Sequence, residues 1–154
     1  MIVGPGNPRL NKIKEIVHKV KEKFENIDVY FQVARISTLM QQAGLAITSN
    51  GRTVFELASL GVPMITISQN SREMAHTFAR ISGGAVDLGL ASVVNDQQLV
   101  TTICDLMSNR KRREEMRANL LRFNLKNGID NVIHEILSIY DKWRINKRQE
   151  KEIE

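Results

Sequence analysis

The sequence predicts an α/β fold, a three-layer arrangement in which a parallel sheet carries helices on both faces. Short apolar runs alternate along the chain with segments of helical periodicity. Polar or glycine-containing turns follow the apolar runs, as expected where right-handed crossovers join parallel strands. The chain has 154 residues, 42% of them hydrophobic, which is enough for one substantial core.

The first residues, MIVGPGNP, predict the end of a strand followed by a loop of glycine and proline. Asn7 is placed to cap a helix that has Pro8 at its first position. Only Ile2 and Val3 lie between the initial methionine and the first glycine, whereas a buried parallel strand has ~4 to 8 apolar residues. We therefore expect the chain to begin at a cut in a longer protein.

Helices and strands then alternate as far as residue 88. The pattern predicts helices over 13–24, 37–43, 52–60 and 70–81, and strands over 27–31, 45–48, 62–67 and 85–88. Asn70 with Glu73, and Asn95 with Gln98, have the spacing of capping boxes, which predicts that a helix begins at each pair.

The C-terminal part predicts further helices. An amphipathic helix covers 99–107, a basic helix covers 110–122, and a helix with an apolar stripe covers 132–143. We expect one domain over 1–145 and a disordered tail over 146–154, because the charged tail has a single aliphatic residue.

Composition narrows the classes of function. The formal charge is +5, but aromatic residues make up only 5% and the basic residues are not interleaved with them, which disfavours a nucleic-acid interface. The basic helix is expected to be a solvated face with pairs of arginine and glutamate.

The single cysteine, Cys104, lies in a stretch of apolar periodicity and is expected to be a small buried hydrophobe. One cysteine forms neither an internal disulfide nor a cysteine metal site, and we expect no metal ion and no cofactor. The sequence has no signal peptide and no apolar run long enough to span a bilayer, which favours a cytoplasmic setting.

Three loops, 4–7, 48–52 and 68–71, follow expected strands. Ligands of parallel sheets bind beyond the carboxyl ends of the strands, so we expect these loops to gather at one edge. The first loop, GPGNP, lacks the G-x-G-x-x-G spacing of dinucleotide sites. The candidate nucleotide-binding residues are Gly4, Gly6, Asn7, Ser49, Asn50, Gly51, Arg52, Thr53 and Glu56.

The segment 49–56 has the chemistry of a ligand-binding turn. Gly51 allows close approach of a ligand to the backbone, and residues 50–53 offer amides, a guanidinium and a hydroxyl to a diphosphate. The Glu56 carboxylate can accept hydrogen bonds from both hydroxyls of a ribose. The alternatives are a plain tight turn with a solvated Arg52, and a Glu56 that only complements the helix dipole.

His76 is placed with Arg72 and Glu73 on the helix that follows the loop over 68–71, close to the expected ligand edge. The alternative is an ordinary exposed histidine on a helix. His18 and His134 are expected at the surface. The sequence has no serine, histidine and acid set at motif spacing and no strong pair of carboxylates, so we assign no catalytic residue.

Together these motifs resemble the carboxyl-terminal, donor-binding domain of GT-B type glycosyltransferases and nucleotide-sugar hydrolases, in the PseG/SpsG branch and, more distantly, the MurG-like enzymes. The resemblance covers nearly the whole chain. It rests on the loop over 4–7, the block LAITSNGRTVFELASLGVP, the segment SQNSREMAHTFARISGGAV and the ending LKNGIDNVIHEIL.

The resemblance implies a Rossmann-like fold and a role for each site residue. Glu56 matches the carboxylate that holds the nucleotide ribose, and residues 50–53 match the turn that faces the diphosphate. Arg72, Glu73 and His76 match the region that contacts the sugar or the phosphates of the donor. The chain departs from the branch at residues 50 and 52, where small residues or glycine are usual.

The resemblance also implies half of an enzyme. The family has a preceding Rossmann-like domain that carries the catalytic base, so we expect no turnover from this chain alone. The function that the resemblance implies is binding of a nucleotide sugar, a UDP-linked acetamido sugar, for a transferase or hydrolase of surface polysaccharide or nonulosonic-acid synthesis. The alternative is a non-catalytic interaction module with a degenerate nucleotide site. A dehydrogenase fragment is disfavoured by the spacing of the first glycine loop.

Overall fold

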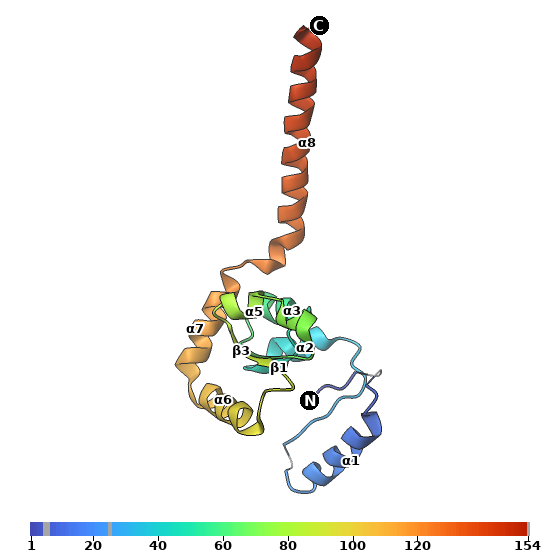
Figure 1. Cartoon of the computed structure of the whole chain (residues 1–154), viewed down its shortest axis with the longest axis vertical. Coiled ribbons are helices and arrows are strands. Elements are labelled where there is room, and N and C mark those ends of the chain that lie inside the picture. The colour runs from blue at the N-terminus through green and yellow to red at the C-terminus, as the bar shows by residue number, and fades with distance from the viewer. Residues whose placement is uncertain (5–6, 25, 154) are drawn as a thin grey trace. The chain divides into compact units, whose positions relative to one another are not determined.

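The computed structural model describes residues 1–4, 7–24 and 26–153. The chain divides into two compact units, Met1–Leu39 and Met40–Glu154, and we describe each by itself (Figure 1). Gly6, one of the candidate site residues, lies outside the described residues. The single domain expected over 1–145 stays a prediction.

The first unit contains helix α1, Leu10–Lys21. Asn7 does not cap this helix as expected. Its Oδ1 atom accepts a hydrogen bond from the backbone N–H of Arg9 (2.9 Å), which closes a local turn, and the helix begins after that turn with Arg9 as its N-cap residue.

The strand predicted over 27–31 is wrong in extent, because the described residues there form only one parallel bridge, between Ile2 and Tyr30. The N–H of Val3 donates to the carbonyl of Tyr30 (2.8 Å), and the N–H of Tyr30 donates to the carbonyl of Met1 (2.9 Å). Among the described residues, no third segment pairs with these two to extend the bridge into a sheet. The aliphatic composition of 27–31 is therefore not enough to form a strand.

The second unit contains a parallel sheet in the order β1-β2-β3. Its strands are β1, Ala46–Thr48, β2, Met64–Ser68, and β3, Ala85–Leu90. Met64 of the central strand is in register with Ala46 on one side and with Ala85 on the other. The predicted parallel sheet is confirmed.

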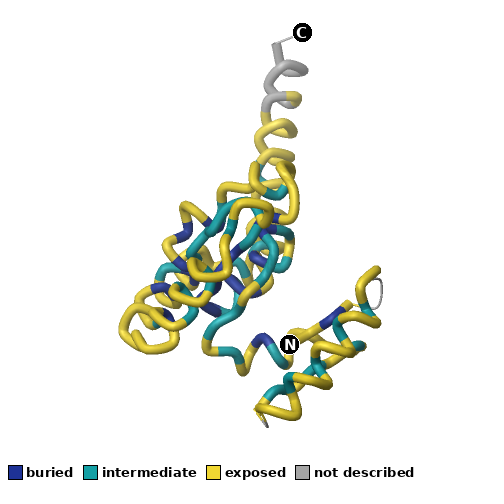
Figure 2. Tube along the Cα trace, turned by 60° about the horizontal axis from the view of Figure 1, so that its bottom comes forward, coloured by how far each residue is buried: buried dark blue, intermediate teal, exposed yellow. Residues whose placement is uncertain are grey.

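Successive residues of β2 point to opposite faces of the sheet and enter different cores. Met64 packs in a cluster with residues of α2, Ile36–Gln42, α3, Thr53–Ser59, and α5, Phe78–Ile81. Ile65 packs in a second cluster with Leu106 of α6, Asp96–Ser108. Figure 2 shows buried positions gathered in the sheet and in the helix faces beside it. Helices therefore cover both faces, which confirms the three-layer prediction.

The helix predicted over 70–81 is interrupted. Asn70 caps it as expected, because its Oδ1 accepts from the N–H of Glu73 (3.0 Å), but α4 ends after Ser71–Met74 and α5 is a separate turn. His76 lies in the break, with its ring bound to the backbone of residue 50. In the same segment the carbonyls of Glu73 and His76 accept hydrogen bonds from the Asn50 side chain (3.1 Å each), a partner outside the helix.

Helix α6 confirms the second capping box, since the Oδ1 of Asn95 accepts from the N–H of Gln98 (2.7 Å). The prediction for Cys104 is wrong: its side chain is exposed. The face of α6 that enters the core contains Leu99, Ile103 and Leu106, and the helical rotation between 103 and 104 turns the cysteine away from it.

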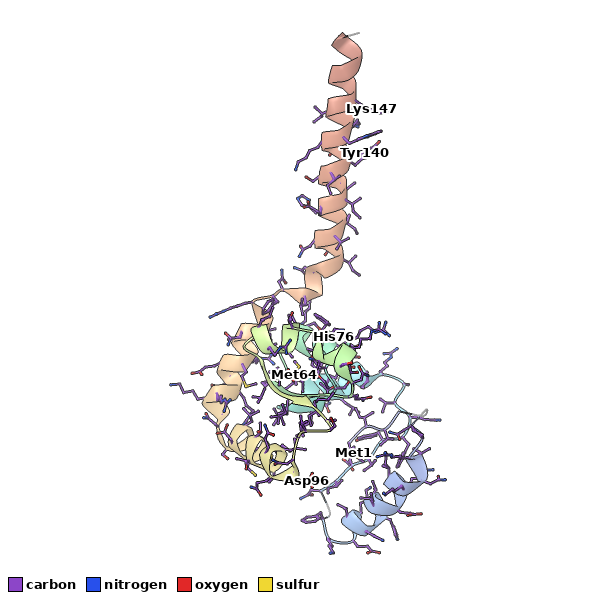
Figure 3. All side chains as sticks on the ribbon, viewed as in Figure 1. Met1, Met64, His76, Asp96, Tyr140 and Lys147 are labelled. Carbon is purple, nitrogen blue, oxygen red and sulfur yellow. The ribbon has the colours of Figure 1, made fainter. Side chains whose placement is uncertain are left out.

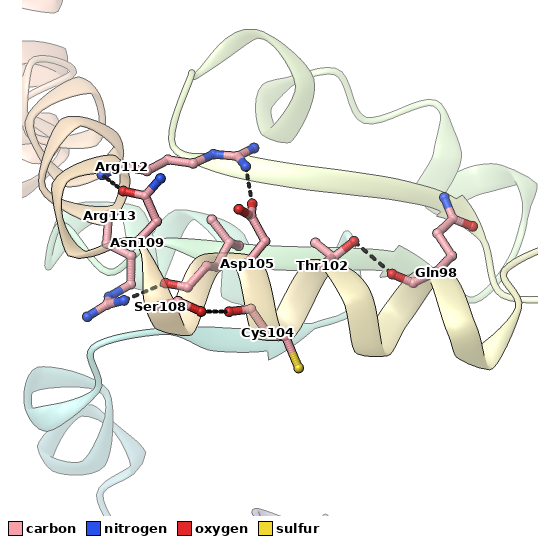
Figure 4. A network of polar contacts seen from close by, with 9 residues as sticks. Gln98, Thr102, Cys104, Asp105, Ser108, Asn109, Arg112 and Arg113 are labelled. Carbon is pink, nitrogen blue, oxygen red and sulfur yellow. Dashed lines mark hydrogen bonds and ion pairs between the residues drawn. The ribbon is translucent and has the colours of Figure 1, made fainter.

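Helix α7, Arg110–Leu121, uses its arginines within the fold (Figure 4). The Arg113 guanidinium donates to the carbonyls of Leu106 and Met107 at the end of α6. Arg117 donates to the carbonyls of Leu60 (3.3 Å) and Gly61 (3.2 Å) after α3. Guanidinium groups therefore bind orphan carbonyls at the ends of two other helices, where the helix dipole is negative.

The two remaining arginines of the first turn of α7 pair with acids. Arg110 pairs with Glu114 (2.7 Å), and Arg112 pairs with Asp105. The first pair is largely exposed and the second about half exposed, so these ion pairs add little stability. The Arg110 pair is of the expected kind, arginine with glutamate on one helix, whereas Arg112 pairs with an aspartate of α6.

The last helix, α8, spans Gly128–Ile153 and follows a single 3-10 turn, Leu125–Asn127. The sequence leads us to expect a disordered tail over 146–154, whereas the backbone is helical through residue 153. Lysine, arginine, glutamine and glutamate, which fill this segment, are good helix formers. Among the described residues, no helix has the length and apolarity needed to cross a membrane.

Helix α8 leaves its apolar stripe in solvent. The large apolar side chains exposed along it are those of Ile129, Val132, Ile133, Ile136, Leu137, Ile139, Tyr140, Trp143 and Ile145. The rings of Tyr140 and Trp143 lie 5.9 Å apart on this helix. Such a long stripe at helical spacing is typical of a surface that another structure covers.

We expect Gly84→Ala to destabilise the second unit. An added Cβ would lie 2.1 Å from Cγ of Leu120, which is fully buried and has no room to move. Overpacking of this kind costs about 1–3 kcal/mol, and urea unfolding would measure it. Gly128→Ala is the matched control, because nothing lies within 4 Å of its added Cβ. Equal unfolding free energies for the two variants would contradict the packing described here.

We expect the Cys104 thiol to react fully with DTNB in the folded protein, because its side chain is exposed on α6. The same reaction in urea provides the reference for complete labelling. A thiol that reacts only after urea is added would show that Cys104 is buried after all.

Candidate functional site

Two loops meet at the carboxyl edge of the sheet. The turn after β1 covers residues 49–52, and the loop after β2 leads into α4 and the break at His76. Because β1 and β2 are parallel and adjacent, their ends lie at the same edge. The structure thus brings together two of the three loops expected there. Gly4 and Asn7, in the third loop, belong to the first unit and are described with it.

Asn50 connects these loops from a buried position, with 1% of its surface exposed. Its side-chain Nδ2 donates to the carbonyl oxygens of Glu73 and His76, at 3.1 Å each. Its own carbonyl oxygen lies 2.7 Å from Nδ1 of His76. The Asn50 side chain therefore makes its hydrogen bonds within the protein. The part of this residue that a ligand would contact is its backbone.

Glu73 completes the junction. Its Oε2 atom accepts from the N–H of Gln69 (2.9 Å), and a Cβ added to Gly51 would lie 3.6 Å from Oε1. The carboxylate thus lies directly beside the glycine of the first turn. Both loops are held by hydrogen bonds that cross from one to the other or close within the α4 cap.

The charged groups of the site lie on the outside of this junction. Arg52, Glu56, Arg72 and His76 are exposed, while Ser49, Gly51 and Thr53 are half-buried. Glu56 stands in the first turn of α3, and its backbone carbonyl accepts from the hydroxyl of Ser59 (2.7 Å). The surface therefore presents two guanidinium groups, one carboxylate and one imidazole around a fixed pair of loops. Figure 3 labels His76 at the break between α4 and α5, and Met64 in the sheet.

Two polar features of this end of the sheet escape the sequence analysis. Ser68, the last residue of β2, is fully buried, and its hydroxyl has no hydrogen-bond partner among the described residues. On the neighbouring strand, Oδ1 of Asp87 accepts from the Thr66 hydroxyl (3.0 Å) and from the N–H of Gly89 (3.2 Å). A serine or threonine within an otherwise aliphatic strand is the signal that could have indicated both.

The hollows of the surface lie elsewhere. One of about 200 Å³ and one of about 370 Å³ both include Gly83 and Asn119, between the turn before β3 and α7. That turn is at the amino end of β3, whereas ligands of parallel sheets bind at the carboxyl edge. We therefore keep the candidate site at the loops, which form an open surface. The described residues contain no cluster of three or more metal-ligating acids, histidines or cysteines.

The second unit is an α/β domain with a parallel sheet, helices on both faces and a pair of loops at the carboxyl edge. Residues 1–135 match the family described as the glycosyltransferase family 28 C-terminal domain, and the chain belongs to this family. By family it is thus a GT-B type glycosyltransferase C-terminal domain.

The chain is similar to one known protein in sequence and to another in fold. It is 31% identical over 110 residues to the spore coat polysaccharide biosynthesis protein SpsG of Bacillus subtilis (strain 168), a match that covers 70% of this chain and 31% of SpsG. The chain thus spans about a third of that relative's length. The crystal structure of the glycotransferase of kitacinnamycin has a similar fold, with a TM-score of 0.50 and 20% identity over 71% of this chain and 29% of that one.

Proposed function

We propose that the chain binds the nucleoside diphosphate part of a nucleotide sugar, as the donor half of a glycosyltransferase or nucleotide-sugar hydrolase. The ligand proposed is a UDP-linked acetamido sugar. Glu56 would hold the ribose, the turn over 50–53 would face the diphosphate, and Arg72, Glu73 and His76 would contact the sugar or the phosphates.

The observation that carries this proposal is the junction of two loops at the carboxyl edge, with Arg52 and Arg72 exposed on it. Guanidinium groups suit a diphosphate because they offer several donors in a planar fork and keep their charge. A rigid pair of loops keeps such donors in place without an ordering cost at the moment of binding.

The Glu56 carboxylate suits a ribose because it only accepts hydrogen bonds and has two oxygens. Glu56 lies in the first turn of α3, next to the turn proposed to face the diphosphate. The ribose and the diphosphate are likewise neighbours in a nucleotide. The plain alternative, a carboxylate that complements the helix dipole, would leave ligand binding unchanged on its removal.

In the full enzyme this domain would orient the donor and stabilise the diphosphate as it leaves. Positive groups aimed at the developing charge lower the barrier, and a fixed donor converts the attack into an effectively intramolecular step. Water would attack in a hydrolase, and an acceptor hydroxyl in a transferase. Similarity to SpsG, a spore coat polysaccharide biosynthesis protein, supports a role in surface polysaccharide synthesis, and nonulosonic-acid synthesis is the other setting proposed.

The proposal includes a partner domain, the N-terminal Rossmann-like half, which would supply the catalytic base. The exposed apolar stripe of α8 supports a covering partner, because burial of such a surface is favourable. The same stripe favours the second candidate, an interaction module with a degenerate nucleotide site. The cytoplasmic setting stays a prediction.

We expect calorimetry to detect UDP binding, and Glu56→Gln to weaken it about ten- to a hundredfold. This range corresponds to hydrogen bonds with a charged group, worth about 1.5–3 kcal/mol. Glu135→Gln, an exposed glutamate on α8, is the matched control and should bind like the original chain. Undetectable UDP binding by a folded chain would favour the interaction module.

We also expect no turnover by the chain alone. UDP-N-acetylglucosamine incubated with the purified protein should release free UDP no faster than it does in buffer, because the proposed base lies on the partner domain. Chromatography of the nucleotides gives the rate. A rate well above that in buffer, rising with protein concentration, would contradict the proposal that the catalytic base lies on the partner domain.

A further inference from the structure

The contact between Asn50 and His76 fixes the position of a proton. A backbone carbonyl has no proton to donate, so the 2.7 Å contact between the Asn50 carbonyl and Nδ1 of His76 is a hydrogen bond only if Nδ1 carries a hydrogen. In the neutral ring the lone pair is then on Nε2. Nε2 thus becomes an acceptor.

The Asn50 side chain maintains this contact from the other direction. Its Nδ2 donates to the carbonyls of Glu73 and of His76 itself, so the two residues hold each other through reciprocal bonds. The reverse orientation of the amide would place its oxygen against two carbonyl oxygens, which repel it, so the orientation follows from the network. Asn50 is buried while His76 is exposed, and the buried residue therefore sets the pose of the exposed ring.

We propose that Asn50 is a positioning residue that holds His76 as the Nδ1–H tautomer, with Nε2 offered to a hydrogen-bond donor of the ligand. This inference rests on the proposed function for the identity of the ligand. A neutral Nε2 repels the oxygens of a diphosphate and attracts a hydroxyl or amide N–H. Because Glu56 is proposed to hold the ribose, the partner left for His76 is a hydroxyl or amide N–H of the transferred sugar, and the arginines remain for the phosphates.

The first test needs no ligand. In a ¹⁵N NMR spectrum of the histidine rings at a pH where they are neutral, we expect His76 to show the Nδ1–H pattern. His18 and His134, both exposed, serve as references within the same spectrum. Asn50→Ala should abolish the preference of His76. Asn119→Ala removes a similar amide-to-carbonyl bond, to Gly83 (3.1 Å), away from the site and should leave the preference intact.

The second test compares two ligands by calorimetry. Asn50→Ala should weaken the binding of UDP-N-acetylglucosamine about tenfold more than it weakens UDP binding, because loosening of the loops affects both ligands and loss of the His76 hydrogen bond affects only the sugar. His76→Ala should give the same difference between the ligands, and it covers the case in which the Asn50 variant does not fold, since the ring is exposed. Asn119→Ala should change neither affinity.

Three results would overturn the inference. They are an Nε2–H form of His76 in the unsubstituted chain, an unchanged tautomer in folded Asn50→Ala, and an equal loss of both ligands in His76→Ala. Failure of the unsubstituted chain to bind UDP at all overturns the proposed function and the ligand part of the inference. In that case the NMR measurement of the His76 tautomer, which needs no ligand, still tests whether Asn50 positions the ring.

Discussion

The parallel pairing of β1 with β2 determines where the rest of the site lies. Because both strands run the same way in register, from Ala46 beside Met64, their last residues end at one edge and their loops emerge side by side. The side chains of β2 then alternate between two cores, which helices close from either side. At the carboxyl edge the polar loops reach solvent, so the buried central strand and the exposed pair of loops follow from the same pairing.

The capping pairs and the order of strand and helix in the second unit could be predicted, because they depend on residues close in sequence. Asn70 with Glu73 and Asn95 with Gln98 form as their spacing indicates. The break at His76 could not be predicted, because the hydrogen bonds made there are to a residue 26 positions earlier, which local spacing does not indicate. The burial predicted for Cys104 is wrong because one position of helical rotation separates it from the buried face of α6. The strand over 27–31 is wrong because no third strand extends its single bridge among the described residues. The loop pair and its exposed charges could be predicted as candidates. The hydrogen bonds of the Asn50 side chain to the carbonyls of Glu73 and His76 could not.

The net charge of +5 has an explanation within the fold. Arg113 and Arg117 bind carbonyls at the ends of α6 and α3, and Arg110 and Arg112 pair with acids. Arg112, Arg113 and Arg117 contact α6 or the end of α3, whereas the Arg110 pair lies within α7. Arg52 and Arg72 differ from them because they stand exposed at the loop junction, which is the place where an anion would meet them. The distribution of arginines therefore separates the cations that stabilise the fold from those proposed to bind a ligand.

The most direct measurement is a UDP titration followed by ¹H–¹⁵N correlation NMR of the whole chain. Binding at the carboxyl edge predicts saturable shifts concentrated in residues 49–56 and 68–76, with little change in α8. Shifts concentrated instead around Gly83 and Asn119, where the surface is hollowed, or no shifts from a folded chain, would contradict a nucleotide site at the junction of the two loops.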